Sequence, residues 1–295
     1  MSDTLRELVI EDHDQVKELC ETIWEGNDYV PDEFPDWISS PNDTPLGIFD
    51  YEELVALCDL ERIENTSIAW IKGLRVKDGH RQKGHGVRIT KALAEIAKQQ
   101  GIRILWYATS SQNKASQHVA ERAGFRLADK TGYFRLYKPY PEHSTPSPTI
   151  IPVEIDAVRL YEILVNTPEL VESTTFPLAW QFDFKSLEGL TRLLHDAVIR
   201  VVIDEEGIAQ GIYCISRRDR KEEIWTAAYT VFATNRTIFV DIIARTIDEA
   251  DALGAERAVY FLGPRTTEWY MALGYVDEEF NGRRFLLYEL NLSDV

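Results

Sequence analysis

One order of predicted elements occurs twice along this chain of 295 residues. In the first half, a strand at 101–107 leads into a helix that ends at Gly124, and a strand at 133–137 follows. In the second half, a strand at 254–262 leads through a helix to the same glycine–aromatic ending and to a strand at 284–288. Self-similarity of this kind indicates an internal duplication.

The two halves also agree before these elements. Ile89 and Leu93 lie on one face of a predicted helix, and the second half has a matching apolar face at the same point. Each half is therefore expected to fold as mixed α/β around a twisted sheet. Two domains of about 140 to 150 residues suit the length. We place them at 1–140 and 151–295, joined by a proline-rich linker at 141–150 that we expect to be exposed.

Charge and cysteine content narrow the class of protein. A net charge of −17 argues against nucleic acid as a partner and favours, weakly, cationic substrates. Three cysteines far apart suggest neither a disulfide framework nor a metal site, and we expect no metal. No apolar run approaches the roughly 18 residues that a membrane span needs. We expect a cytoplasmic protein, monomeric or homodimeric, without a membrane partner.

A glycine-containing hexapeptide, Arg81–Gly86, follows a predicted strand at 67–76 and opens the helix that carries Ile89. Two glycines let backbone N–H groups approach a ligand, and the start of a helix adds partial positive charge. The loop therefore suits a pyrophosphate. A Walker loop is excluded because His85 stands where its lysine should be, and a dinucleotide fingerprint is excluded because Ile89 replaces its third glycine.

The remaining pattern, Arg81-x-x-Gly84-x-Gly86, resembles the acetyl-coenzyme A signature of the GNAT acetyltransferases. Asn113-x-x-Ser116, followed by Gly-Phe, resembles the second signature of that family. The resemblance covers about residues 5–138 and, more faintly, the second half. It implies two tandem GNAT-like domains and transfer of an acetyl group from acetyl-coenzyme A to an amine.

The same resemblance implies a coenzyme site. Backbone N–H groups of the loop would hold the pyrophosphate, the preceding strand would pair with the pantetheine arm, and the asparagine would hydrogen-bond that arm. The implied residues are Leu74, Arg75, Val76, Arg81, Gln82, Lys83, Gly84, His85, Gly86, Val87, Asn113 and Ser116.

The second half lacks this loop. The segment 232–239 contains no glycine, and Gly263 stands where Asn113 stands in the first half. Side chains would fill the space that phosphates need. We therefore expect the second domain to be a degenerate copy that binds no coenzyme and shapes the substrate pocket or braces the first domain.

The catalytic groups are less clear from the sequence. The family often uses a tyrosine to protonate the leaving thiolate, but Ala120 occupies that position here, and Tyr270 occupies it in the second half. Other hydroxyls could serve, and we name Tyr133 first; the other candidates are Tyr107, Ser110 and Ser111. For the base that deprotonates the amine, we name Glu61 first; Glu64 and His118 are the alternatives.

The segment 23–38 is rich in aromatic and acidic residues where GNAT folds place the helices that cover the substrate. Asp28, Tyr29 and Trp37 could form a pocket for an amine with a planar side chain, or could serve for packing alone. The segment also resembles the histidine N-acetyltransferase group, which implies a free amino acid or another small-molecule amine as acceptor. A non-catalytic coenzyme A-binding sensor and a protein N-acetyltransferase remain as alternatives.

Overall fold

A computed structural model describes residues 3–23, 28–218, 225–275 and 282–293. The chain divides into two compact units. The first comprises residues 1–109, 113–128 and 287–295, and the second comprises residues 110–112 and 129–286. Each unit is mixed α/β, which confirms the predicted fold class. Among the described residues, no helix is long and apolar enough to cross a membrane.

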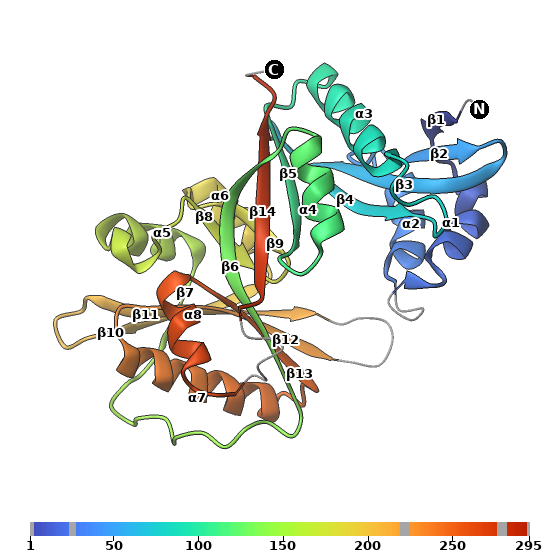
Figure 1. Cartoon of the computed structure of the whole chain (residues 1–295). Coiled ribbons are helices and arrows are strands. Elements are labelled where there is room, and N and C mark those ends of the chain that lie inside the picture. Colours follow the sequence, from blue (N-terminus) through green and yellow to red (C-terminus); the bar gives the residue numbers. More distant parts are fainter. Residues whose placement is uncertain (1–2, 24–27, 219–224, 276–281, 294–295) are drawn as a thin grey trace. The chain divides into compact units, whose positions relative to one another are not determined.

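The first unit is a sheet with helices on both faces (Figure 1). Its strands follow the order β1-β2-β3-β4-β5-β14. Neighbours from β1 to β4 are antiparallel, whereas β4 and β5 are parallel. The elements are β1 (Thr4–Glu7), η1 (Ile10–Asp12), α1 (His13–Cys20), α2 (Val30–Ser39), β2 (Leu46–Asp50), β3 (Glu53–Arg62), β4 (Ile68–Val76), α3 (His85–Gln99), β5 (Ile104–Ser110), α4 (Lys114–Arg122) and β14 (Arg284–Asn291).

The helices of this unit lie where their apolar faces require. The predicted face of α3 is buried through Ile89, Leu93 and Ala97. Helices α1 and α2 cover the opposite side of β3 and β4 (Figure 1), and Phe34 of α2 packs into the core that Leu57 of β3 shares. Both faces of β4 are thereby covered, and the strand is held between α3 and α2.

The second unit repeats the arrangement. Its strands follow the order β6-β13-β12-β11-β10-β7, in which only β12 and β13 form a parallel pair among the described strands of this order. The elements are β6 (Arg126–Tyr137), β7 (Val153–Ile155), α5 (Ala157–Asn166), η3 (Pro168–Leu170), β8 (Thr175–Leu178), β9 (Gln181–Phe184), α6 (Leu187–Leu193), β10 (Ala197–Ile203), β11 (Ala209–Arg218), β12 (Thr226–Ala233), α7 (Arg236–Ala252), β13 (Arg257–Leu262) and α8 (Pro264–Met271).

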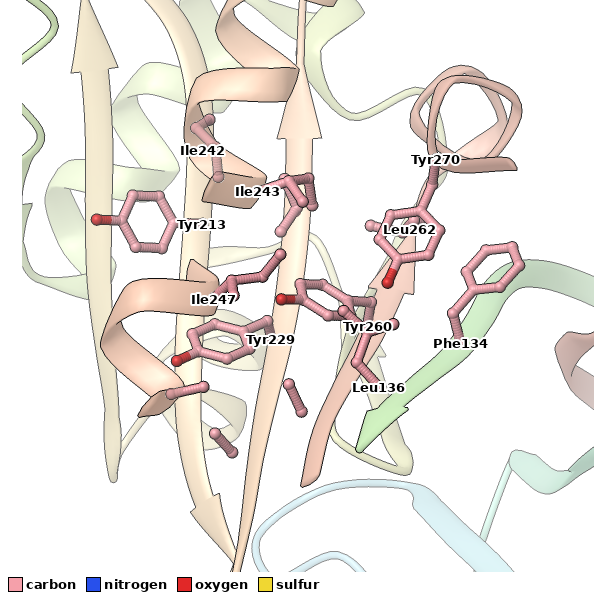
Figure 2. Close-up of a cluster of buried hydrophobic side chains, with 14 of the residues drawn as sticks. Phe134, Leu136, Tyr213, Tyr229, Ile242, Ile243, Ile247, Tyr260, Leu262 and Tyr270 are labelled. Atoms are coloured by element: carbon pink, nitrogen blue, oxygen red, sulfur yellow. The ribbon is translucent and has the colours of Figure 1, made fainter. Parts of the chain in front are cut away.

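Aromatic rings dominate the core of the second unit. Figure 2 shows Tyr229, Tyr260 and Tyr270 among the aliphatic side chains of α7. Tyr270 is fully buried and stacks on Phe134 with 4.7 Å between ring centroids. Its hydroxyl has no hydrogen-bond partner among the described residues. Tyr270, at the family's acid position in the second half, is therefore a core residue.

The observed boundaries differ from those we placed at 140 and 150. Strand β6 was assigned to the first half, but its residues from Asp129 onward belong to the second unit, where β6 pairs with β13. The last strand of the chain, β14, lies next to β5, and residues from Leu287 onward belong to the first unit. Each half therefore contributes its final strand to the sheet of the other half. Local sequence patterns do not encode this pairing, because the paired strands are far apart in the chain.

The predicted linker is exposed or half-buried throughout, as expected, but it is not a free spacer. Arg245 of α7 donates hydrogen bonds to the carbonyl oxygens of Ser147 and Ile150, and the Asp241 carboxylate accepts one from the Ser147 N–H. His143 contacts the Asp248 carboxylate at 3.0 Å. The segment 141–150 is thus fastened to α7 within the second unit.

Candidate active site

The glycine loop ends at the start of α3. Gly84 is the N-cap of α3 and has φ of +88°, a left-handed conformation that glycine adopts without strain. The first N–H groups of a helix lack carbonyl partners within it. No side chain caps α3 among the described residues, and no acidic residue lies in its first turn. The N-terminus of α3 therefore keeps its positive end available to an anion.

Space around the two glycines differs. A Cβ atom on Gly84 would meet no atom within 4 Å, so open space lies beside this residue. A Cβ atom on Gly86 would lie 3.1 Å from Val119 of α4 and 3.6 Å from Leu74 of β4. Gly84 thus leaves room for a ligand, whereas Gly86 allows α3 to approach α4 and β4.

The side chains of the glycine loop lie in different environments. His85 is buried, and burial lowers its pKa. Arg81 is exposed and forms an ion pair of 3.0 Å with Asp78. Lys83 is exposed. The predicted contacts of Gln82 to Val87 therefore depend on backbone N–H groups, with Lys83 as the exposed cation that precedes Gly84 in the chain.

Strands β4 and β5 pair over only part of their length. The pairing begins with Ile68 opposite Ile104 and ends with Ile71 opposite Tyr107, which is the last rung of this ladder. Strand β4 continues to Val76 and strand β5 to Ser110. Beyond the Ile71–Tyr107 rung, the backbone of Lys72 to Val76 has no strand on its β5 side among the described residues. This is the segment in which Leu74, Arg75 and Val76 were predicted to pair with the pantetheine arm.

A bulge lies just past that rung. The register of β3 with β4 shifts between Leu57, which faces Arg75, and Asp59, which faces Lys72. Gly73 within the bulge has φ of +65°, and a Cβ atom there would lie 2.5 Å from the Trp37 ring of α2. The bulge therefore requires glycine for two independent reasons and redirects the β4 backbone where its pairing with β5 has ended.

Two hydroxyls meet on the α4 side of the rung. The Tyr107 hydroxyl and Ser116 Oγ lie 2.6 Å apart. Ser116 also donates its backbone N–H to Asn113 Oδ1, which caps α4. The structure thus brings together the predicted residues Asn113 and Ser116 with Tyr107, while Ala120 on the same helix is fully buried.

Charged groups cluster on the α2 side of β3 and β4. Lys72 Nζ lies 3.1 Å from Glu61 Oε2, 2.8 Å from Asp43 Oδ1 and 3.5 Å from Asp59 Oδ2. Burial, with Asp43 alongside, raises the pKa of Asp59 to about 8. Burial alone would lower the pKa of Lys72, but the surrounding carboxylates raise it instead.

This cluster contains both a predicted residue and residues that the sequence reading missed. The Glu61 side chain is 40% exposed, so the predicted base is accessible to solvent. Asp59 is fully buried, and its Oδ2 accepts no hydrogen bond from any described residue. A lone carboxylate in the apolar run of β3 was the sequence signal for Asp59.

Asp28, predicted to bind substrate, is held by Arg75 instead. Arg75 Nε and Nη2 donate to its two carboxylate oxygens, each at 2.6 Å. The Asp28 side chain is 1% exposed and that of Arg75 is 10% exposed. The Arg75 guanidinium also lies 5.3 Å from the centre of the Tyr29 ring. This group fastens the start of α2 to β4, because a bidentate pair satisfies both buried charges.

Trp37, the third predicted substrate residue, lies on α2 over the bulge. Its side chain is buried, and Lys72 Nζ lies 5.2 Å from its ring centre. Trp37 therefore packs on the face that carries Lys72 and Glu61. Its predicted contact with substrate stays a prediction.

Tyr133, the acid that we named first, belongs to the second unit. It is buried, its hydroxyl accepts hydrogen bonds from Arg135 and Trp180, and its ring lies 5.4 Å from that of Phe261. These contacts give Tyr133 a packing role in the sheet of that unit. The alternatives Glu64 and His118 are both exposed.

The second unit is filled differently at the matching position, where Phe232 and Gly263 line a cavity of only about 30 Å³. Its parallel pair runs to Val231 with Leu262, and the Phe232 ring then packs on Phe176 with 5.4 Å between centroids. A Cβ atom on Gly263 would lie 2.8 Å from Phe232. Asn235 caps α7 by accepting the Ile238 N–H. Side chains therefore occupy both the strand end and the helix start.

Comparison with known proteins now gives these features a context. Residues 7–125 match the acetyltransferase (GNAT) family. The Arabidopsis thaliana protein named Probable N-acetyltransferase HLS1 is 32% identical over 114 residues, which cover 35% of this chain and 27% of that protein. The chain thus spans only about a quarter of the length of this curated relative.

Solved structures resemble the chain over its whole length. A tandem GNAT protein from the clavulanic acid biosynthesis pathway has a TM-score of 0.61 at 13% identity and covers 99% of both chains. A GCN5-related N-acetyltransferase from Sphaerobacter thermophilus has a TM-score of 0.62 at 11% identity, with 98% of this chain and 96% of that chain covered. At these identities the likeness concerns the fold alone. Residues 7–125 thus carry the match to the acetyltransferase (GNAT) family, and the whole chain has the fold of tandem GNAT proteins.

Proposed function

We propose that this protein is an N-acetyltransferase that moves an acetyl group from acetyl-coenzyme A to the amine of a small molecule. The proposal depends on two features of the first unit that follow each other along the chain, the end of β4 and the start of α3. The uncapped N-terminus of α3 lies beside the open space at Gly84, and the preceding strand, β4, pairs with no described strand on its β5 side beyond Ile71. Together they suit a ligand with a pyrophosphate at one end and an extended amide-bearing arm at the other.

Two parts of acetyl-coenzyme A, the pyrophosphate and the pantetheine arm, would have partners in the first unit. Backbone N–H groups from Gln82 to Val87 would hold the pyrophosphate, and the β4 backbone at Leu74 to Val76 would hydrogen-bond the pantetheine amides. The Asn113 amide nitrogen is available to the arm, because capping of α4 uses only its oxygen. When bound, acetyl-coenzyme A supplies the activated acetyl group.

The chemistry is attack of a neutral amine on a thioester carbonyl. An ammonium group has no lone pair, so a base must first take its proton. Glu61 is the accessible carboxylate on the α2 side of the rung, and Lys72 fixes its position at 3.1 Å. Backbone N–H groups of β4 near the bulge at Gly73 would be the donors that stabilise a developing oxyanion.

A free amino acid or similar small amine is the acceptor class that we propose to test first. The support is the chemistry near the rung, where the Glu61 and Asp43 carboxylates both contact the ammonium group of Lys72. An excess of carboxylates favours a cationic acceptor. Trp37 and Tyr29 supply planar surfaces on the same side of the sheet.

One observation favours a second candidate, a coenzyme A-binding sensor without turnover. Ala120 replaces the usual acid, and its position is fully buried. Release of coenzyme A thiol in the presence of acetyl-coenzyme A and a panel of amino acids, polyamines and peptides separates the two functions. Amine-dependent thiol release supports the enzyme, whereas binding without thiol release with any amine supports the sensor.

A further inference from the structure

The hydroxyl pair of Tyr107 and Ser116 occupies a place that the proposed reaction has not yet used. Tyr107 is the last residue of β5 that pairs with β4, and Ser116 lies in the first turn of α4. Their oxygen atoms are 2.6 Å apart, a short hydrogen bond between neutral hydroxyls. The pair therefore links the point where the two strands stop pairing to the helix that Asn113 caps.

The two hydroxyls differ in exposure. Tyr107 is 4% exposed, whereas Ser116 is half-buried. In the arrangement that satisfies both groups, the phenol donates to Ser116 Oγ, and the serine proton points to the more accessible side. Burial raises the pKa of Tyr107, so the phenol stays protonated and keeps donating at neutral pH.

The location matches one end of the proposed ligand. An arm that begins at Gly84 and follows β4 backward passes Val76 and Leu74 before it reaches the Ile71–Tyr107 rung. The end opposite the pyrophosphate carries the sulfur. The hydroxyl pair is on the α4 side of this rung, and the Lys72 cluster is on its α2 side. The leaving group and the attacking amine would thus meet different sets of polar groups.

We infer that Ser116 Oγ, held by the Tyr107 hydroxyl, donates the hydrogen bond that stabilises the departing coenzyme A thiolate. This inference rests on the proposed function. The amine nitrogen forms a bond to the acetyl carbon, the carbon–sulfur bond breaks, and its electron pair stays on sulfur. Over the whole reaction the amine nitrogen loses one proton and the sulfur gains one. The hydroxyl pair donates a hydrogen bond to the sulfur and keeps its own protons. Ser116 is the donor and Tyr107 is a positioning residue.

The remaining surroundings of the phenol agree with this role. The groups that act electrostatically on Tyr107 besides Ser116 are Cys58, Arg75 and Tyr29. Burial raises the pKa of Cys58, so its thiol is neutral at physiological pH. Arg75 is already paired with Asp28. On the α4 side of the rung, the Tyr107–Ser116 hydroxyl pair is therefore the hydrogen-bond donor that would replace a tyrosine at position 120.

The test measures the pKa of the coenzyme A thiol bound to the full-length protein, through its ultraviolet thiolate absorbance. Ser116→Ala removes the donor but keeps the backbone N–H that Asn113 caps, and Tyr107→Phe keeps the ring. We expect each variant to raise the pKa of the bound thiol by about 1, the equivalent of roughly 1.4 kcal/mol. Ser116→Thr should restore the wild-type value, and Gln117→Ala, on the neighbouring residue of α4, should not change it.

Turnover gives the second measurement. We expect both removal variants to lower kcat about tenfold or more, with less than about a threefold change in coenzyme affinity. Coenzyme A that binds with the same thiol pKa in wild type, Ser116→Ala and Tyr107→Phe would overturn the inference and leave the proposed function standing. Wild-type protein that fails to bind coenzyme A at all would overturn the proposed function itself.

Discussion

Tyr107 of β5 faces Ile71 of β4 in the last rung that joins the two parallel strands of the first unit. The glycine loop, the bulge at Gly73, the Tyr107–Ser116 pair and the Lys72 cluster are all arranged along β4 around this rung. The second unit has the same pair of parallel strands, but Phe232 packs on Phe176 just beyond their last pair, Val231 and Leu262. The two units therefore differ in what lies just beyond the last paired residues of their parallel strands.

Replacement of Gly73 should destabilise the protein for two reasons. Gly73→Ala places a Cβ atom 2.5 Å from the buried Trp37 ring and forces a residue with a side chain into φ of +65°. The backbone cost alone is roughly 1 to 2 kcal/mol. Gly79→Ala is the matched control, because Gly79 has φ of +82° with open space around it. Urea unfolding should show a larger loss for Gly73→Ala, and equal losses would contradict the steric role of Trp37.

The Asp28–Arg75 pair should be costly to break from one side. Asp28→Ala leaves a guanidinium group that is 10% exposed without its partner, and we expect a loss of about 3 to 5 kcal/mol in the free energy of unfolding. Arg75→Met combined with Asp28→Ala removes both charges and should recover much of that loss. If the double variant is as unstable as the sum of the two single variants, the pair is not coupled as the structure indicates.

Asp59 should make stability depend on pH. Its pKa rises from 3.8 to about 8 on folding, so the folded chain holds a proton that the unfolded chain has lost between these values. The free energy of unfolding contributed by Asp59 is therefore fully present below 3.8 and falls as the pH rises toward 8. Asp59→Asn should flatten this part of the stability profile relative to wild type, whereas Glu61→Gln, at an exposed carboxylate on the same lysine, should not. An unchanged slope in Asp59→Asn would refute this assignment.

Local features of the site were predictable from the sequence because they depend on local backbone chemistry. Gly84 ends a strand-to-helix turn and needs a left-handed φ, and Asn113 caps the helix that follows it. Apolar patterns likewise predicted several strands, among them β4, β5 and β13, and the buried face of α3. These patterns extend over only a few residues, so they can be recognised without knowledge of the tertiary fold.

Long-range pairing was the part that sequence patterns could not supply. Tyr133 was named as a candidate acid of the first domain, but its strand, β6, pairs with β13 of the second unit. Asp28 was predicted to bind substrate. Its partner in the structure, Arg75, lies 47 residues further along the chain, so the sequence pattern around Asp28 did not indicate the ion pair. The bulge at Gly73 also changes which β4 side chains share a face, and this places Lys72 with Asp59 and Glu61.

The central claim is that the chain has a single coenzyme site and that this site lies at the start of α3. Titration calorimetry of the full-length protein with acetyl-coenzyme A tests it most directly, with Gly84→Glu as the variant and Gly101→Glu as the control. Gly101 also has a left-handed φ, of +79°, with open space around it, but it follows the opposite end of α3.

We predict one acetyl-coenzyme A bound per chain in wild type and in Gly101→Glu, and no binding in Gly84→Glu, since the added carboxylate would fill and repel the phosphate site. Two molecules bound per chain, or wild-type affinity in Gly84→Glu, would contradict the account.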